Sequence, residues 1–168
     1  MSTELLVLRH AIAFPRDAKR WPEDAERPLT AEGVKRARRA AAGLKRITQR
    51  PLRVLTSPLV RARDTAMIFA QAAHWPKAVE CEALSPGGSP EGVLETLRRH
   101  GGKVDCVAVV GHQPLLGRLI ALCVRGNVPP EVFELKKSAV ACLEFEGGPR
   151  AGQGTLAWLL APRILRKL

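Results

Sequence analysis

The chain has 168 residues, 46% of them hydrophobic, which is enough for a folded domain with a substantial core and excludes a disordered chain. Its formal net charge of +11 indicates anionic partners such as nucleic acid, a phosphorylated protein or a small phosphate ester. Only 4% of the residues are aromatic and none is tyrosine, which disfavours nucleic-acid binding because readers of single strands need stacking rings.

The sequence shows no signal for a membrane span, a secretory leader or a metal site. No stretch approaches the roughly 20 apolar residues of a transmembrane helix, and the apolar run at the N-terminus is too short for a signal peptide. We therefore expect a cytoplasmic location. The four cysteines form no C-x-x-C pair and the four histidines lack zinc-ligand spacing. Buried free thiols are expected at Cys81, Cys106, Cys123 and Cys142, with no metal and no cofactor.

The first predicted element is a buried strand over residues 5–8, which ends at Arg9 and His10. Residues 11–29 are rich in Pro, Arg and Asp and predict a long loop. Thr30 predicts the N-cap of a helix whose apolar residues recur at helical spacing.

A second strand and helix follow. Residues 52–55 predict a short strand, after which Ser57 is expected as an N-cap and Pro58 as the first helical residue. Residues 79–81 predict a short third strand.

The second half of the chain repeats this alternation. A loop rich in Gly and Pro leads to a predicted helix that ends near Gly101. Residues 104–110 give the strongest strand signal, being apolar on both faces, and the next helix has Pro114 near its first turn. Two last strands are predicted over residues 139–145 and 155–160.

Strands that alternate with helices predict an α/β fold: a three-layer sandwich with a mostly parallel central sheet flanked by helices. We find no repeat, low-complexity segment or linker, so residues 1–168 are expected to form a single domain.

Polar residues follow three of the predicted strands directly. In open α/β sheets, ligands bind outside the carboxyl ends of the strands. The expected convergence of Arg9, His10, Ser57, Arg61 and His112 on one crevice, with helix N-termini beside them, predicts a site for a doubly charged anion, and phosphate is the natural candidate.

These residue types also imply a chemistry. A neutral imidazole such as His10 can attack phosphorus, and surrounding cations favour its neutral form. Arg9 and Arg61 can hold the phosphoryl oxygens, with His112 as a third donor. With so much fixed positive charge, a metal ion is unnecessary.

Five segments together resemble a known family. "LVLRHA", "RPLTAEG", "TSPLVRARDTA", "LSPGGSPEGVLETL" and "VAVVGHQPLLGRLIALC" are similar, in this order, to segments of the histidine phosphatase superfamily, and in particular to its short SixA-type phosphohistidine phosphatases. The resemblance implies a phosphoglycerate mutase-like fold. It also implies that His10 is the phosphorylated nucleophile, that Arg9, Arg61 and His112 complete the phosphate pocket, and that Arg27 is a further arginine lining it.

The sequence departs from the family pattern at Ala11, where relatives more often have Gly, so we expect a backbone φ below zero there. Ser57 and Gln113 are further candidate substrate-binding residues, although Gln113 stands where relatives vary. Glu82 resembles the region that supplies a general acid in other members of the superfamily. The chain has no long insertion to form a lid, so the crevice is expected to be shallow and open.

The leading hypothesis is a metal-independent phosphatase with a phosphohistidine enzyme intermediate, acting on phosphohistidine in a signalling protein. A phosphoamide can manage without an enzyme acid because the leaving imidazole takes up a proton itself, whereas an alkyl ester needs one. Two alternatives remain: a phosphatase for a small phosphate ester, and a non-catalytic basic module that binds phosphorylated protein, polyphosphate or nucleic acid.

Overall fold

The computed structural model describes residues 2–101, 104–129 and 133–168. Its middle layer is a six-stranded mixed sheet. In spatial order the strands are β3 (Val79–Glu80), β2 (Arg53–Thr56), β4 (Cys106–Gly111), β1 (Ser2–Arg9), β5 (Val140–Glu146) and β6 (Gly154–Leu160). The strands β1 to β4 are parallel, whereas β5 and β6 run antiparallel to their neighbours. The predicted α/β architecture with a mostly parallel sheet is confirmed.

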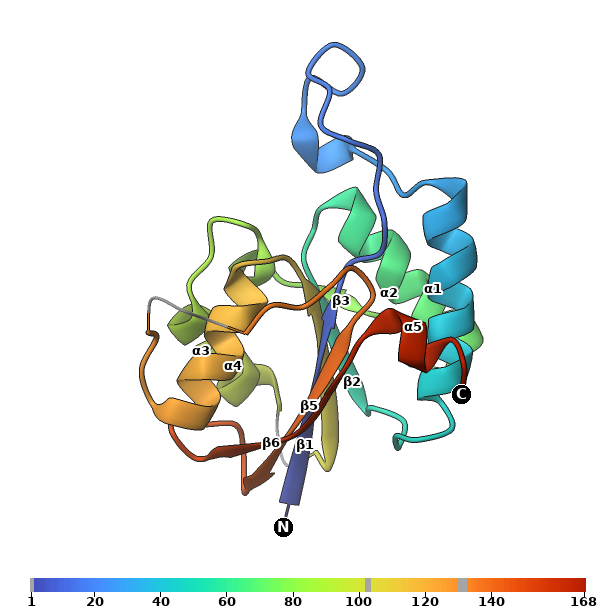
Figure 1. Cartoon of the computed structure of the whole chain (residues 1–168). Helices are drawn as coiled ribbons and strands as arrows, with labels where there is room; N and C mark the ends of the chain where they lie inside the picture. Colours follow the sequence, from blue (N-terminus) through green and yellow to red (C-terminus); the bar gives the residue numbers. More distant parts are fainter. Residues whose placement is uncertain (1, 102–103, 130–132) are drawn as a thin grey trace.

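Helices cover both faces of the sheet, which gives three layers (Figure 1). One face carries α1 (Ala31–Leu44), α2 (Val60–Ala72) and the short α5 (Pro162–Leu165). The other face carries α3 (Pro90–Gly101) and α4 (Leu115–Arg125). Two 3₁₀ helices, η1 (Asp24–Glu26) and η2 (Glu82–Leu84), lie in loops.

The alternation of side chains along β1 explains the two-sided core. Leu6 and Leu8 pack into the cluster with α1 and α2, while Leu5 and Val7 pack into the cluster with α3 and α4. All four side chains are fully buried, each contributing about 1.5–3 kcal/mol from removal of apolar surface from water. A strand covered on both faces therefore reads as a continuous apolar run.

The start of α1 follows the prediction and the start of α2 does not. Thr30 caps α1, because its hydroxyl oxygen accepts the Gly33 amide hydrogen at 2.9 Å. The expected Ser57 N-cap and the expected first helical position at Pro58 are wrong: α2 begins at Val60 after Leu59. Ser57 still belongs to the sheet edge, where its N–H donates to the Val110 carbonyl at 2.9 Å.

The predicted long loop between β1 and α1 extends beyond the carboxyl edge of the sheet (blue in Figure 1). An isolated bridge between Ala13 and Leu29 closes its base. Near its tip the Arg20 guanidinium stacks over the Phe14 and Trp21 rings, at 4.7 and 4.4 Å from their centroids.

All four cysteines are buried and free, as predicted. Among the residues described, no helix has the length and apolar character needed to cross a membrane.

Candidate active site

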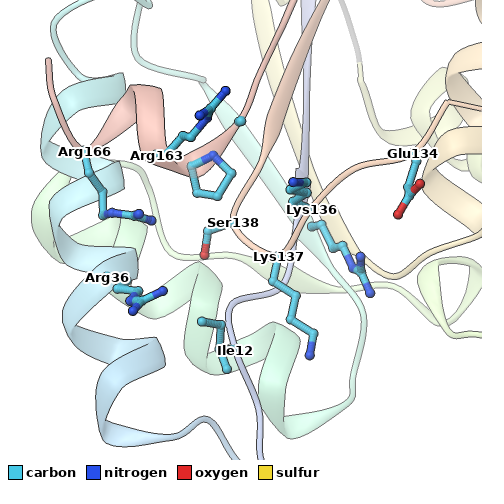
Figure 2. A pocket seen from close by; sticks show the side chains of 11 residues that line it. Ile12, Arg36, Glu134, Lys136, Lys137, Ser138, Arg163 and Arg166 are labelled. Carbon is cyan, nitrogen blue, oxygen red and sulfur yellow. The ribbon is translucent and has the colours of Figure 1, made fainter.

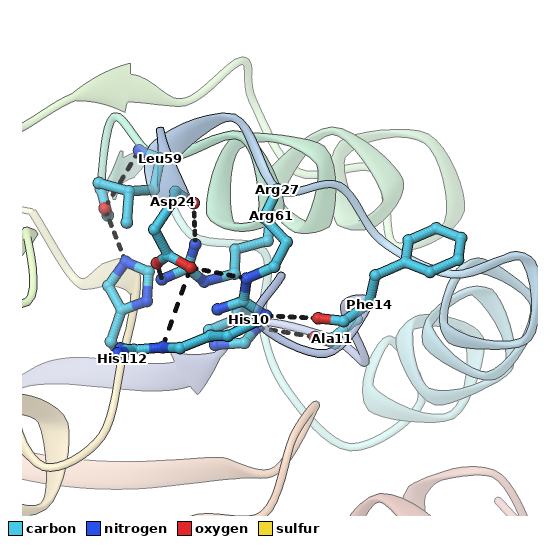
Figure 3. Close-up of polar contacts among 10 residues, drawn as sticks. His10, Ala11, Phe14, Asp24, Arg27, Leu59, Arg61 and His112 are labelled. Atoms are coloured by element: carbon cyan, nitrogen blue, oxygen red, sulfur yellow. Dashed lines mark hydrogen bonds and ion pairs between the residues drawn. The ribbon is translucent and has the colours of Figure 1, made fainter. Parts of the chain in front are cut away.

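The carboxyl edge of the parallel strands brings the predicted residues together (Figure 3). Arg9 is the last residue of β1, and His10, Ser57 and His112 directly follow β1, β2 and β4. The His10 N–H donates to the Gly111 carbonyl at 3.0 Å, which holds the two strand ends side by side. As a result the rings of His10 and His112 lie 5.1 Å apart between centroids.

The proton on the His10 ring can be assigned from its surroundings. Its Nδ1 lies 2.7 Å from the carbonyl oxygen of Ala11, which can only accept a hydrogen bond. Nδ1 therefore carries the hydrogen, and Nε2 keeps a free lone pair. Ala11 is not among the residues with a positive φ, as predicted, and its N–H donates to Thr65 Oγ1 at 2.9 Å.

Both site histidines are held neutral. Burial, against a raising effect of the Ala11 carbonyl and together with the nearby His112, Arg61 and Arg9, lowers the pKa of His10 to about 3. Burial, Arg61 and Arg9 lower the pKa of His112 to about 3 as well. At neutral pH, His10 Nε2 thus carries an uncharged lone pair that is available for attack on an electrophile.

A hydroxyl orients His112. Its Nε2 lies 2.8 Å from Ser57 Oγ, and this oxygen also accepts the Leu59 N–H at 3.3 Å. The Ser57 hydroxyl has one hydrogen to donate, and we assign it to the bond with Nε2, which leaves the ring proton on Nδ1, an atom with no partner in the described part of the chain. His112 therefore presents an N–H donor at Nδ1.

Three buried donor atoms in the site have no hydrogen-bond partner in the described part of the chain: Arg9 Nε, Arg61 Nε and His112 Nδ1. Buried polar groups without partners are rare and costly in folded proteins. Here they belong to the three residues that the sequence places around His10. An oxyanion is the ligand that such a set of donors fits.

Asp24, a residue that the sequence analysis missed, lies beside Arg61 and Arg27 (Figure 3). Its carboxylate accepts from Arg61 Nη2 at 3.1 Å and from Arg27 Nε at 2.8 Å, and its backbone carbonyl accepts from Arg61 Nη1 at 2.9 Å. The Arg27 hydrogen bond is the main cause that lowers the pKa of Asp24. Only its position three residues before Arg27 pointed to it, since an i, i+3 pair can meet across one turn.

Lys137 is a second residue that the sequence analysis missed. Burial lowers the pKa of its ammonium group, and Arg9, Arg27 and Arg61 lower it further, so this group lies within reach of the same cations. Arg9 itself donates from Nη1 to the Leu135 carbonyl at 2.7 Å, which ties it to the loop that carries Lys137.

Arg27 is buried and its second donor, Nη1, bonds the Phe14 carbonyl at 2.6 Å. The long loop between β1 and α1 thus delivers both Arg27 and Asp24 to the edge of the sheet.

The structure places two candidates in other contacts. Gln113 uses both polar ends on backbone groups: its Nε2 donates to the Phe133 carbonyl at 3.0 Å, and its Oε1 accepts from the Gly117 N–H at 2.9 Å. Glu82 is exposed, and its carboxylate accepts from Ser85 Oγ at 2.9 Å. In the described ranges, no three His, Cys, Asp or Glu side chains gather closely enough to hold a metal ion.

The sequence of the chain matches a protein family and individual relatives. Residues 5–85 match the model of the histidine phosphatase superfamily, branch 1. The chain is 31% identical over 167 residues to the phosphohistidine phosphatase SixA of Escherichia coli K12, covering 97% of this chain and 96% of that protein. It is also 40% identical over 138 residues, 82% of each chain, to an uncharacterized protein of Picosynechococcus sp..

The fold matches a solved structure over almost its whole length. The protein histidine phosphatase SixA complexed with tungstate superposes with a TM-score of 0.80 at 30% identity, over 97% of this chain and 99% of that one. Shared sequence along the chain and a shared fold agree with the family resemblance of the five segments. The chain therefore belongs to the histidine phosphatase superfamily.

Proposed function

We propose that this phosphatase acts through a covalent phosphohistidine on His10 and removes phosphate from phosphohistidine in a protein. The main support for this proposal is a set of buried hydrogen-bond donors without partners on Arg9, Arg61 and His112. They lie next to a neutral His10 whose Nε2 is free. Such a set is complementary to a phosphoryl group under attack from His10.

The reaction takes two steps. The lone pair of His10 Nε2 forms a bond to phosphorus as the P–N bond to the substrate imidazole breaks, and the leaving nitrogen takes a proton from solvent. The oxygen of a water molecule then forms a bond to phosphorus as the bond to His10 Nε2 breaks and its electron pair returns to Nε2; the water gives a proton to solvent, and inorganic phosphate leaves. Arg9, Arg61 and the Nδ1–H of His112 hold the phosphoryl oxygens in both steps.

Fixed cations do the work that a metal ion does in other phosphatases. Arginine pairs with phosphoryl oxygens through two parallel hydrogen bonds and stays charged at any physiological pH. Arg9 at the end of β1 and Arg61 in the first turn of α2, with Arg27 and Lys137 close by, support catalysis without added metal.

The choice of substrate rests on the absence of a positioned acid among the described residues. Asp24 is held ionised by Arg27, and Glu82 bonds to Ser85. A phosphoamide tolerates this, because its leaving imidazole accepts a proton directly, whereas an alkyl phosphate ester has a poor leaving group that needs an acid. The relative from Escherichia coli that is named a phosphohistidine phosphatase supports the same substrate.

The test compares a phosphohistidine peptide with sugar phosphates and nucleotides, in buffer with and without EDTA. We expect a higher kcat/KM for the phosphohistidine peptide and no effect of EDTA. A sugar phosphate or nucleotide turned over more efficiently would contradict the substrate, and a strict need for Mg²⁺ or Zn²⁺ would contradict the role of the arginines.

The nucleophile is tested separately. His10→Ala removes the attacking nitrogen and should abolish turnover, whereas His100→Ala, at an exposed histidine in the last turn of α3, should leave it intact. Quenching the wild-type reaction should trap acid-labile, base-stable phosphate on His10. Phosphate found on Ser57 or Cys81, or substantial activity in His10→Ala, would overturn the mechanism.

A further inference from the structure

A second cationic cavity adjoins the phosphate site. It has a volume of about 520 Å³ and lies between α1, α5 and the loop of residues 134–138 (Figure 2). Arg9 lines this cavity and also belongs to the phosphate site. Ser138, another lining residue, donates its N–H to the Arg9 carbonyl at 3.1 Å, so the cavity wall is bonded to the segment that carries His10.

The charge of the cavity is strongly unbalanced. One carboxylate, Glu134, lines it together with six cationic side chains: Arg9, Arg36, Lys136, Lys137, Arg163 and Arg166. Arg36 is paired with Glu32 on α1 at 2.6 Å. Burial lowers the pKa of Arg9, and the charge of Glu134 acts against this lowering. No carboxylate in the described ranges lies within ion-pair distance of the other four.

Gathering these cations brings like charges together, which opposes folding unless an anion joins them. Lys137 connects the two sites, because it lines the cavity while Arg9, Arg27 and Arg61 act on its ammonium group. An anionic group in the cavity would therefore lie beside a phosphoryl group held at His10. This adjacency favours two anionic groups carried by one substrate.

The lining residues favour carboxylates of a protein over nucleic acid. None of the residues that line the cavity is aromatic, whereas single-stranded nucleic acids bind largely by stacking on rings. Arg36, Lys136, Lys137 and Arg163 are exposed, so their charged groups are open to a partner as large as a folded protein. Flexible lysine and arginine side chains at a solvent-open surface suit acidic side chains on such a partner.

We propose that this cavity is a docking site for Asp or Glu side chains that flank the phosphohistidine of the substrate protein. The proposal rests on the proposed function, since it assigns the neighbouring residues of that same substrate. Docking raises kcat/KM by placing the phosphorylated imidazole over the arginines, and it leaves the chemistry at His10 unchanged.

The test uses paired charge reversals. Arg163→Glu with Arg166→Glu reverses two cations of the cavity, and neither side chain makes a hydrogen bond or ion pair in the described structure. Arg98→Glu with Arg125→Glu changes the net charge equally, but on α3 and α4 at the other face of the sheet. Lys136→Glu, on the loop across the cavity, is a second and independent reversal.

Two phosphohistidine peptides of one length are compared, one with flanking Asp and Glu and one with Asn and Gln. The wild type should favour the acidic peptide by about tenfold in kcat/KM, as expected for a few solvent-exposed ion pairs. The Arg163→Glu, Arg166→Glu variant and Lys136→Glu should lose this preference, while the Arg98→Glu, Arg125→Glu variant keeps most of it. Turnover of para-nitrophenyl phosphate, which has no flanking carboxylate, should be equal in all four proteins.

A binding measurement separates this proposal from the proposed function. Fluorescence anisotropy of the acidic peptide without phosphate should show salt-sensitive binding to the wild type that weakens about tenfold in Arg163→Glu, Arg166→Glu. If no phosphohistidine peptide is hydrolysed, the proposed function fails while this binding still supports the docking site. Equal turnover of both peptides by the wild type, equal losses in the α3 and α4 control, or tighter cavity-dependent binding of an oligonucleotide would each overturn the docking site.

Discussion

A single residue, Ser57, controls which ring nitrogen of His112 carries the hydrogen. Ser57 Oγ lies 2.8 Å from His112 Nε2, and a hydrogen that this hydroxyl donates to Nε2 keeps the ring proton on Nδ1. Ser57→Ala removes this hydroxyl, so the ring can place its proton on Nε2 and lose its donor toward phosphate. Loss of the hydrogen-bond partner that orients a histidine lowers affinity or activity by about tenfold to a hundredfold in metal sites. We expect a similar fall in kcat here, with little change in KM.

The tautomer itself gives the discriminating measurement for Ser57→Ala. Nitrogen NMR of the imidazole should report protonated Nδ1 in the wild type and a mixture of tautomers in the variant. A variant with wild-type kcat and an unchanged nitrogen spectrum would show that the hydroxyl does not set the proton of His112.

Asp24 places a negative charge inside the proposed phosphate site. Its carboxylate bonds Arg61 and Arg27, so it both positions these arginines and repels a bound phosphate. Asp24→Asn keeps the shape and removes the charge. We expect inorganic phosphate to inhibit this variant more strongly, by about threefold to tenfold, because one like charge at a few ångströms is gone.

We also expect kcat of Asp24→Asn to fall, since Arg61 loses a charged anchor. Glu26→Gln, two residues away and exposed, removes the same charge outside the arginine cluster and should change neither value. Weaker inhibition of Asp24→Asn by phosphate would instead make positioning the dominant role of the carboxylate.

At the scale of elements, α2 fixes the turn that follows β1. Thr65 is fully buried on α2; its Oγ1 donates to the Arg61 carbonyl at 2.7 Å and accepts the Ala11 N–H at 2.9 Å. Thr65→Val keeps the shape but leaves the Ala11 N–H unpaired, so the free energy of unfolding should fall by about 1–3 kcal/mol. Urea denaturation measures this, and kcat should fall with it because the turn carries His10.

Thr65→Ser keeps the hydroxyl and loses one methyl group, so it should retain kcat even if some stability is lost. If Thr65→Ser loses kcat as severely as Thr65→Val, packing of the methyl group controls the turn, and the hydrogen bond to Ala11 does not.

Elements that are determined by local sequence were predicted well. Strands β1 and β4 are apolar on both faces, and Thr30 is followed at once by helical periodicity, so these signals needed no tertiary information. The strand-end residues followed from topology, because parallel strands bring their carboxyl ends to one edge.

The errors and omissions have a common physical cause, which is contact between segments distant in the sequence. Ser57 before Pro58 is a typical helix start, but a histidine 55 residues away takes its hydroxyl, and α2 begins later. Asp24 and Lys137 lie in loops without periodicity. Their places depend on how those loops pass over the sheet edge, and no local pattern in the sequence reports that path.

At the scale of the whole molecule, the buried site histidines lower the free energy of unfolding in acid. Two neutral histidines are buried beside arginines, so each must stay unprotonated in the folded chain. The unfolded chain has no such constraint, and its histidines take up protons near their usual pKa of about 6.5. Acid should therefore unfold this protein earlier than its carboxylates alone would require.

The sign follows from proton counts. Between pH 6.5 and the folded pKa of about 3, the unfolded state binds one more proton at His10 and one more at His112 than the folded state does. The free energy of unfolding thus decreases as the pH falls through this range, by at most about 1.4 kcal/mol per pH unit for each histidine. Urea midpoints between pH 7 and pH 4.5 measure the slope. His10→Gln and His112→Gln should each make this slope smaller, whereas His100→Gln, in the exposed last turn of α3, should not. Equal slopes in the wild type and the three variants would mean that the site histidines are protonated in the folded state.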